Sequence, residues 1–163
     1  MYCPCPYHEK EESLILFKSN EKKNVKLDVK CTSQTHDKPT LFKCRNCNLI
    51  FSEYINKNFE EDYSKVEDTK YIDQIPFKEK YFKLLLHKIK PFLNKESNVL
   101  EIGSYYGVLG NIIKPFVNNY TGLELSKHAA QYSKNAYGLN IENDTLSNFL
   151  NKNLLFDVII MSD

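Results

Sequence analysis

The sequence lacks three features that would place a protein in a membrane, outside the cell or on nucleic acid. Its longest apolar run is only a few residues, as in the segment 13–17, which is too short for a helix that spans a bilayer. Its N-terminus has no basic segment followed by an apolar one, so no signal peptide is expected. With a net charge of +1 and no segment where basic residues concentrate, it lacks the positive face that binds a phosphate backbone. We expect a cytoplasmic protein without a membrane or nucleic-acid partner.

Cysteine is absent after position 47, and the five cysteines stand at positions 3, 5, 31, 44 and 47. An odd number of cysteines in a chain without an export signal argues against a disulfide framework. Their clustering near the N-terminus indicates a metal site instead. Cys31 stands apart from the others and is expected to be a plain thiol.

Apolar and charged residues make up 42% and 26% of the 163 residues, as in soluble globular proteins. A chain of this length holds one ordinary domain, or a small module and part of a larger domain. Changes in the sequence pattern divide it into a module at residues 1–52, a polar connector at 53–76 with one short helix, and a larger domain at 77–163.

The first module is expected to be a small β structure. Val25, Leu27 and Val29 alternate with polar residues, which is the period of a half-buried strand. Apolar residues lead into Cys44 and out of Cys47. This cysteine pair is therefore expected at a tight turn between two strands.

The larger domain begins with an amphipathic helix and continues as alternating strands and helices. From Phe77, apolar residues at positions 82, 85, 86 and 89 share one helical face, and Pro91 or the residues just after it would end the helix. Strands that alternate with helices imply βαβ units and a parallel sheet, hence an α/β fold class. Four strands are expected, at Asn98–Ile102, Tyr120–Leu125, Leu139–Ile141 and Phe156–Ile160.

A glycine turn follows the first of these strands. Between Gly103 and Gly107 stand only Ser104, Tyr105 and Tyr106, and each glycine lets a ligand approach the backbone where a Cβ would be in the way. At the carboxyl end of a buried strand, the N–H groups of such a turn face a bound ligand. We therefore expect a ligand site here.

Glu124 lies at the end of the next strand, 21 residues after Gly103. An acidic residue in that place accepts hydrogen bonds from both hydroxyls of a ribose, and we expect it to do so without contributing to the fold. The turn and this carboxylate together predict a ligand of the nucleoside type. A nicotinamide dinucleotide is the disfavoured alternative, because its G-x-G-x-x-G turn needs a glycine where Tyr105 stands.

The spacing Glu-x-Gly-x-x-x-Gly from Glu101 to Gly107 resembles the first motif of class I S-adenosylmethionine-dependent methyltransferases. The stretch from Val99 to Asp163 resembles the first four of that family's seven strands. The resemblance implies a Rossmann-like sheet and S-adenosylmethionine as the cofactor. It also implies a chain truncated after the fourth strand, as a fragment or as a natural truncation, with the general base beyond Asp163.

The same resemblance implies roles for the candidate site residues. Glu101, Gly103 and Gly107 would lie along the methionine part of the cofactor, and Glu124 would hold its ribose. The pair Asp144 and Thr145 falls near the adenine, and Ser162 and Asp163 fall near the methyl-transfer centre; no catalytic residue is assigned. The expected cofactor-binding set is Glu101, Gly103, Ser104, Tyr105, Gly107, Glu124, Leu125, Asp144, Thr145 and Ser162.

The segment from Cys44 to Cys47 is a C-x₂-C turn, which presents two thiolates to one tetrahedral zinc ion while a second pair completes four ligands. The second pair is two of Cys3, Cys5 and His8. The arrangement resembles the zinc-ribbon-like N-terminal domain that precedes some bacterial methyltransferases, including sugar C-methyltransferases. In that family the first pair is normally C-x₂-C, whereas Cys3 and Cys5 are one residue closer. This resemblance suggests a nucleotide-linked sugar as the acceptor.

The sequence therefore predicts a methyltransferase that acts on a small acceptor. The alternative is a zinc-ribbon binding module with a vestigial α/β half and no catalysis. The many tyrosines either pack between the modules or line a substrate cleft, and packing is the favoured alternative. The fourth strand, uncovered at the sheet edge, is expected to promote self-association. The tyrosines in question include Tyr54, Tyr63, Tyr71 and Tyr81.

Overall fold

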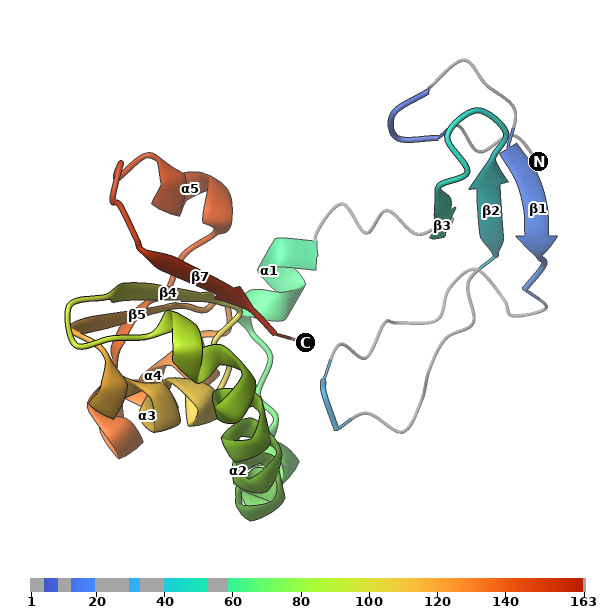
Figure 1. Ribbon diagram of the computed structural model, residues 1–163. Helices are drawn as coiled ribbons and strands as arrows, with labels where there is room; N and C mark the ends of the chain where they lie inside the picture. Colours follow the sequence, from blue (N-terminus) through green and yellow to red (C-terminus); the bar gives the residue numbers. More distant parts are fainter. Residues whose placement is uncertain (1–4, 9–12, 20–29, 33–39, 53–58, 163) are drawn as a thin grey trace. The chain divides into compact units, whose positions relative to one another are not determined.

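The computed structural model describes residues 5–8, 13–19, 30–32, 40–52 and 59–162. The chain forms two compact units (Figure 1). The N-terminal unit comprises Met1–Asp28 and Ser33–Asn58, and the C-terminal unit comprises Val29–Thr32 and Phe59–Asp163. The short piece Val29–Thr32 thus belongs to the C-terminal unit, although it lies within the stretch that the sequence pattern assigns to the first module.

The N-terminal unit contains an antiparallel sheet in the order β1-β2-β3. Its strands are β1 (Ser13–Phe17), β2 (Leu41–Cys44) and β3 (Ile50–Ser52). The turn that carries Cys47 joins β2 to β3, as the sequence predicts. The strand expected at residues 25–29 lies outside the described residues.

This sheet has little core of its own. Phe42 is fully buried and stacks on Phe51, with 5.8 Å between the ring centroids. The four apolar residues of β1, in contrast, are each between 43% and 51% exposed. Among the described residues of this unit, burial of apolar surface therefore contributes little to stability.

The C-terminal unit begins with two helices, α1 (Phe59–Ser64) and α2 (Thr69–Ile89), and α2 is followed by the 3₁₀ turn η1 (Lys90–Phe92). Helix α2 starts eight residues before the expected start at Phe77 and contains Pro76 in its interior. Proline inside a helix removes one backbone hydrogen bond and costs about 3 kcal/mol. The first half of α2 is nonetheless helical, because it buries Tyr71 and Ile75 in an apolar cluster with Tyr106 and Val108.

After η1 the chain forms a parallel sheet of four strands, β4 (Asn98–Ile102), β5 (Asn119–Leu123), β6 (Asn140–Glu142) and β7 (Val158–Met161), in the order β6-β5-β4-β7. The connections contain α3 (Val108–Ile113), the 3₁₀ turn η2 (Lys114–Phe116), α4 (Lys127–Tyr137) and α5 (Leu146–Leu150). The α/β fold class is confirmed. The four expected strands are present, with ends that differ by one or two residues.

Helices cover both faces of this sheet. Helices α2, α3 and α4 lie on one face and α5 lies on the other (Figure 1). The larger core, around Val99, Leu109 and Ile113, fills the first face, and Leu100 packs with Phe149 of α5 on the second. No helix in the described parts of the chain has the length and apolarity needed to cross a membrane.

The strand order fixes where a ligand can bind. From β4 the chain moves outward through β5 to β6, and it then returns to β7 on the opposite side of β4. The connections after β4 and β7 therefore diverge, and a crevice opens beyond the carboxyl ends of these two strands. The glycine turn after Ile102 and the residue Ser162 after β7 lie at this position.

Candidate functional site

The glycine turn after β4 is built by three residues with positive φ. These are Gly103 with φ 76°, Tyr105 with φ 46° and Gly107 with φ 73°. A Cβ added at Gly103 would meet nothing within 4 Å, so this glycine borders open space, as expected for a ligand site. A Cβ at Gly107 would lie 2.8 Å from side-chain atoms of Ser133 and Leu139. Gly107 is therefore needed for packing against Ser133 of α4 and Leu139, and its contact with a ligand stays a prediction.

Four of the five N–H groups from Gly103 to Gly107 donate hydrogen bonds within the protein. Those of Gly103 and Ser104 donate to the carbonyl of Leu123, at 2.8 and 3.1 Å, and that of Gly107 donates to the carbonyl of Ser104 at 2.8 Å. The N–H of Tyr105 donates to Glu124. The expectation that these groups face a ligand is therefore wrong, and side chains provide the polar contacts of the crevice.

Tyr105 has a positive φ, a backbone conformation that residues other than glycine rarely adopt. Four contacts hold it there. Its N–H donates to Glu124 Oε2 at 2.7 Å, its carbonyl accepts from Ser133 Oγ at 3.1 Å, and its hydroxyl donates to Asp68 Oδ2 at 3.1 Å. Its ring also meets the ring of Tyr71 edge-on, with 4.7 Å between centroids. These contacts offset the cost of the strained conformation.

Asp68 joins this turn to the short piece Val29–Thr32. Its carboxylate, in a residue only 1% exposed, accepts hydrogen bonds from the N–H and the hydroxyl of Thr32 as well as from Tyr105. Its own N–H donates to the hydroxyl of Tyr106 at 3.0 Å. Cys31 is thereby fixed beside the crevice and lines it.

Glu124 has a structural role in addition to its place in the crevice. The residue is 2% exposed, and besides the N–H of Tyr105 its carboxylate accepts the N–H of Ser126 at 2.6 Å. Burial raises the pKa of this carboxyl, although the hydrogen bonds from Ser126, Tyr105 and Leu125 lower it. The expectation that Glu124 leaves the fold unaffected is wrong, since it holds the turn in place.

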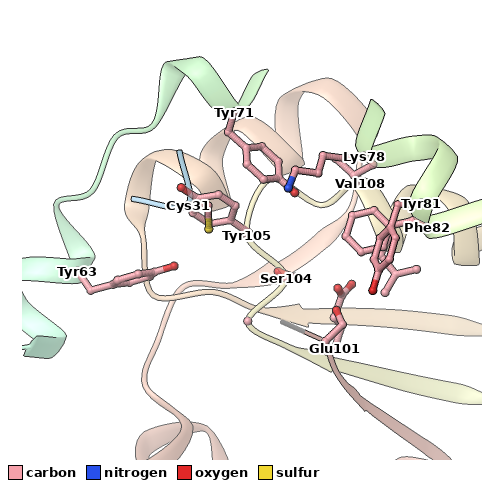
Figure 2. A pocket seen from close by; sticks show the side chains of 13 residues that line it. Cys31, Tyr63, Tyr71, Lys78, Tyr81, Phe82, Glu101, Ser104, Tyr105 and Val108 are labelled. Atoms are coloured by element: carbon pink, nitrogen blue, oxygen red, sulfur yellow. The ribbon is translucent and has the colours of Figure 1, made fainter. Parts of the chain in front are cut away.

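The crevice contains a first cavity of about 290 Å³ between the sheet and α2 (Figure 2). Glu101, Gly103 and Ser104 from the end of β4, Tyr105 from the turn, and Ser162 from the end of β7 line it. The hydroxyl of Ser104 is buried and has no hydrogen-bond partner among the described residues. The other lining residues are Cys31, Tyr63, Tyr71, Lys78, Tyr81, Phe82, Val108 and Leu109.

Three of the tyrosines line this cavity. The sequence favoured packing between the modules for these residues over lining a cleft. Tyr63 belongs to α1, and Tyr71 and Tyr81 belong to α2. Tyr54 lies outside the described residues. Because α2 lies over the carboxyl end of β4, the rings of Tyr71 and Tyr81 reach the cavity.

Glu101 is the carboxylate of the first cavity. It is 2% exposed, and its Oε2 accepts a hydrogen bond from the hydroxyl of Tyr120. Burial raises its pKa to about 7, helped by the charge of Glu124 and opposed by the hydrogen bond from Tyr120. A cation bound in the cavity would favour the charged form of this carboxyl.

A second cavity of about 320 Å³ shares Gly103 and Tyr63 with the first. Glu124, Leu125, Asp144 and Thr145 line it, together with Phe59, Glu60, Ile102, Leu123 and Leu146. Nine of the ten expected cofactor-binding residues thus line one cavity or the other, the exception being Gly107.

Asp144 and Thr145 are also fixed by the start of α5. The hydroxyl of Thr145 caps this helix by accepting the N–H of Asn148 at 3.2 Å. Asp144 Oδ1 accepts the side-chain amide of Asn148 and the N–H of Thr145, each at 2.8 Å. These bonds, the one from Asn148 first, lower the pKa of Asp144, so its carboxylate is charged at neutral pH.

Lys78 and Phe82 also line the first cavity, and neither belongs to the set of site residues that the sequence predicts. Phe82 was assigned to the apolar face of the helix that packs on the sheet. Lys78 stands four residues before Phe82, one helical turn away on the same side of α2. That spacing was the signal that would have placed Lys78 at the cavity.

In the N-terminal unit, Cys5, His8, Cys44 and Cys47 form a cluster whose ligand atoms all lie within 4.8 Å of one another. Cys5 Sγ lies 3.8 Å from Cys47 Sγ and 3.7 Å from His8 Nδ1, and Cys44 Sγ lies 3.9 Å from His8 Nδ1. Ligands about 2.0 to 2.3 Å from a tetrahedral metal ion are separated by roughly 3.5 to 3.8 Å. The cluster can therefore hold a metal ion. Cys3, the remaining candidate, lies outside the described residues.

No protein family and no curated protein matches the sequence. Among solved structures, the chain is similar to an S-adenosylmethionine-dependent methyltransferase from Clostridium acetobutylicum, with 23% identity over 64% of this chain and 42% of that chain and a TM-score of 0.42. It is also similar to a SAM-dependent methyltransferase from Archaeoglobus fulgidus, with 16% identity over 52% and 38% of the chains and a TM-score of 0.41. A third is the plantazolicin methyltransferase BpumL in complex with SAH, with 21% identity over 65% and 38% of the chains and a TM-score of 0.37. The chain spans less than half the length of each.

The raised pKa of Glu101 predicts how stability depends on pH. The folded chain binds this proton more tightly than the unfolded chain, whose glutamate pKa is near 4.5, so the free energy of unfolding should fall as pH rises from there to about 7. Glu101→Gln keeps an oxygen for the Tyr120 hydroxyl and removes the ionisation. In urea denaturation, the free energy of unfolding of the variant minus that of the unmodified protein should rise by roughly 2 to 3 kcal/mol from pH 5 to pH 8. Glu142→Gln is the control, and equal pH profiles for the unmodified protein and Glu101→Gln would contradict the assignment.

Proposed function

We propose that the C-terminal unit binds S-adenosylmethionine and transfers its methyl group to a small acceptor. The observation that carries this proposal is the pair of cavities that share Gly103 at the carboxyl ends of β4 and β5. A nucleoside with an amino-acid extension has two parts of different chemistry. Glu124 and the pair Asp144 and Thr145 provide polar contacts for ribose and adenine in the second cavity, and Glu101 provides one for the extension in the first.

The same geometry argues against a dinucleotide cofactor. A pyrophosphate needs free N–H groups in the turn, and those of Gly103, Ser104, Tyr105 and Gly107 all donate within the protein. The Tyr105 side chain also lines the first cavity. The sulfonium cofactor needs no such cradle, because it carries no phosphate.

Methyl transfer is an in-line displacement at the sulfonium methyl group, so the protein mainly positions donor and acceptor. When bound, S-adenosylmethionine supplies the activated methyl group. Burial raises the pKa of Tyr71 and of Tyr105, so both hydroxyls stay protonated and neither serves as a general base.

For the acceptor we propose a nucleotide-linked sugar, which rests on the resemblance of the N-terminal module to that of sugar C-methyltransferases. A cytoplasmic location is part of the same proposal. The competing function, a metal-dependent binding module whose α/β half binds no cofactor, predicts no affinity for a sulfonium nucleoside.

S-adenosylhomocysteine should bind with about one site per chain in calorimetric titration, and NAD should not bind. Glu124→Gln keeps one oxygen acceptor and loses the charge, so it should weaken this binding by roughly 1.5 to 3 kcal/mol, the cost of losing hydrogen bonds to a charged group. Near-UV circular dichroism checks that the turn stays in place. Glu142 lies on β6, where its carboxylate pairs with Lys152. The variant Glu142→Gln is the control and should bind S-adenosylhomocysteine normally. Absence of S-adenosylhomocysteine binding to the unmodified protein would refute the function.

We propose further that the cluster of Cys5, His8, Cys44 and Cys47 holds one structural zinc ion. Two thiolate pairs, or three thiolates and one imidazole as here, form closed tetrahedral zinc sites. The ligands come from two segments far apart in the chain, and zinc would join them in a unit with a small core. Zinc binding would thus stabilise the N-terminal unit.

Elemental analysis should find about one zinc per chain, lost when Cys44 and Cys47 are both replaced by serine. Cys31→Ser and Cys3→Ser are the matched controls and should keep the metal, because Cys31 belongs to the C-terminal unit and four ligands are complete without Cys3. Chelation should unfold the N-terminal unit while the far-UV signal of the C-terminal helices persists. Full zinc content in the double variant would rule the site out.

We propose, finally, that β7 mediates self-association. It lies at the edge of the sheet, and Ile159 and Met161 are 58% and 76% exposed. Beside it a groove of about 610 Å³ is lined by Leu85, Ile89 and Phe92. An exposed apolar edge strand pairs readily with another chain.

Light scattering should therefore show a mass that rises with concentration. Ile159→Lys places a charge on the edge and should shift the protein to the monomer. Leu155→Lys, at a residue 91% exposed that precedes β7, adds the same charge away from the strand and should leave association unchanged. A monodisperse monomer of the unmodified protein would exclude this role.

A further inference from the structure

The first cavity contains two side chains of opposite charge that do not pair with each other. Among the described residues that line it, Lys78 is the cation and Glu101 is the carboxylate. Figure 2 shows Lys78 reaching from α2 to the ring of Tyr71, while Glu101 lies on the side of the sheet. The lysine ammonium is 5.4 Å from the centroid of that ring, and the carboxylate is fixed by Tyr120.

Lys78 and Lys80 of α2 each lie over an aromatic ring without an ion-pair partner among the described residues, and of these two only Lys78 lines the first cavity. Lys65 and Lys83 each pair with a glutamate four residues earlier, at 2.6 and 3.5 Å. The residue four positions before Lys78 is Gln74, and no carboxylate among the described residues lies within ion-pairing distance of it. A lysine that is half-buried, lines a cavity and has no carboxylate within ion-pairing distance favours binding of an anion there.

An anionic ligand alone would not account for the cavity, because the carboxylate of Glu101 favours a cation. An α-amino acid group carries a carboxylate and an ammonium on adjacent atoms, and it satisfies both side chains at once. Its aliphatic chain would pass the apolar side chains of Val108 and Leu109, which also line the cavity.

We propose that Lys78 binds the α-carboxylate, and Glu101 the α-ammonium, of an amino-acid group in the first cavity. On the function proposed above, on which this assignment rests, that group is the methionine end of the cofactor. The adenosine part then extends past Gly103 to Glu124 in the second cavity, since the two cavities share that glycine. Lys78 thus selects cofactors that carry a free carboxylate.

Calorimetric titration with two nucleosides tests the role of Lys78. S-adenosylhomocysteine carries the amino-acid group, and 5′-methylthioadenosine lacks it. Lys78→Gln should weaken binding of the first roughly ten- to a hundredfold, as for loss of a hydrogen bond to a charged group, and leave the second unchanged. Lys80→Gln, on the same helix but outside the cavity, is the matched control and should bind both normally. Lys78→Arg, which keeps the charge, should retain most of the affinity.

A change to the ligand provides a test that needs no variant. The carboxamide of S-adenosylhomocysteine should bind the unmodified protein ten- to a hundredfold more weakly, by roughly the factor that Lys78→Gln loses with the free acid. If the unmodified protein binds neither nucleoside, the proposed function fails. If it binds S-adenosylhomocysteine, but the carboxamide binds as well or Lys78→Gln weakens both nucleosides equally, only the assignment of Lys78 is overturned.

Discussion

The buried carboxylate of Glu124 holds together the parts of the C-terminal unit that form the crevice. One oxygen accepts the N–H of Tyr105 and the other accepts that of Ser126. Ser126 in turn caps α4 through Ala129 and donates its hydroxyl to the carbonyl of Val66. A strained turn, a helix start and the segment before α2 therefore share one anchor. Removing it would leave two buried N–H groups without a partner, at about 1 to 3 kcal/mol each.

The described parts of the two units differ in how much apolar core they bury. The C-terminal unit buries an apolar core on each face of its sheet. In the described part of the N-terminal unit the first strand is half-exposed, and the fully buried side chains are Phe42 and two of the clustered thiols, Cys5 and Cys44. On the proposal that this cluster binds zinc, the metal would supply stability that the small apolar core of the described sheet does not.

Local patterns were sufficient to predict the parallel sheet and most of the crevice. Periodicity and glycine spacing located β4 to β7, and the placement of Glu124 and Asp144 after strands brought them to one edge. The start of α2 was not predictable, because Pro76 signals a break and only packing of Tyr71 on Tyr105 and Tyr106 outweighs it. The role of Gly107 also depends on a distant contact, with Ser133, as does the engagement of the turn N–H groups with the carbonyl of Leu123. Such contacts leave no trace in local spacing.

The chain crosses between its units three times, since Val29–Thr32 belongs to the C-terminal unit while the residues on either side belong to the N-terminal one. The hydrogen bonds from Thr32 to Asp68 fasten this piece, and Cys31 forms part of the cavity wall. A C-terminal fragment cut at Phe59 would lack this piece, and with it two of the hydrogen bonds to the buried carboxylate of Asp68. The N-terminal unit cannot be replaced as one continuous segment, because Val29–Thr32 lies within its stretch of the sequence. A chimera that exchanges the C-terminal unit should therefore exchange Val29–Thr32 together with the residues from Phe59 onward.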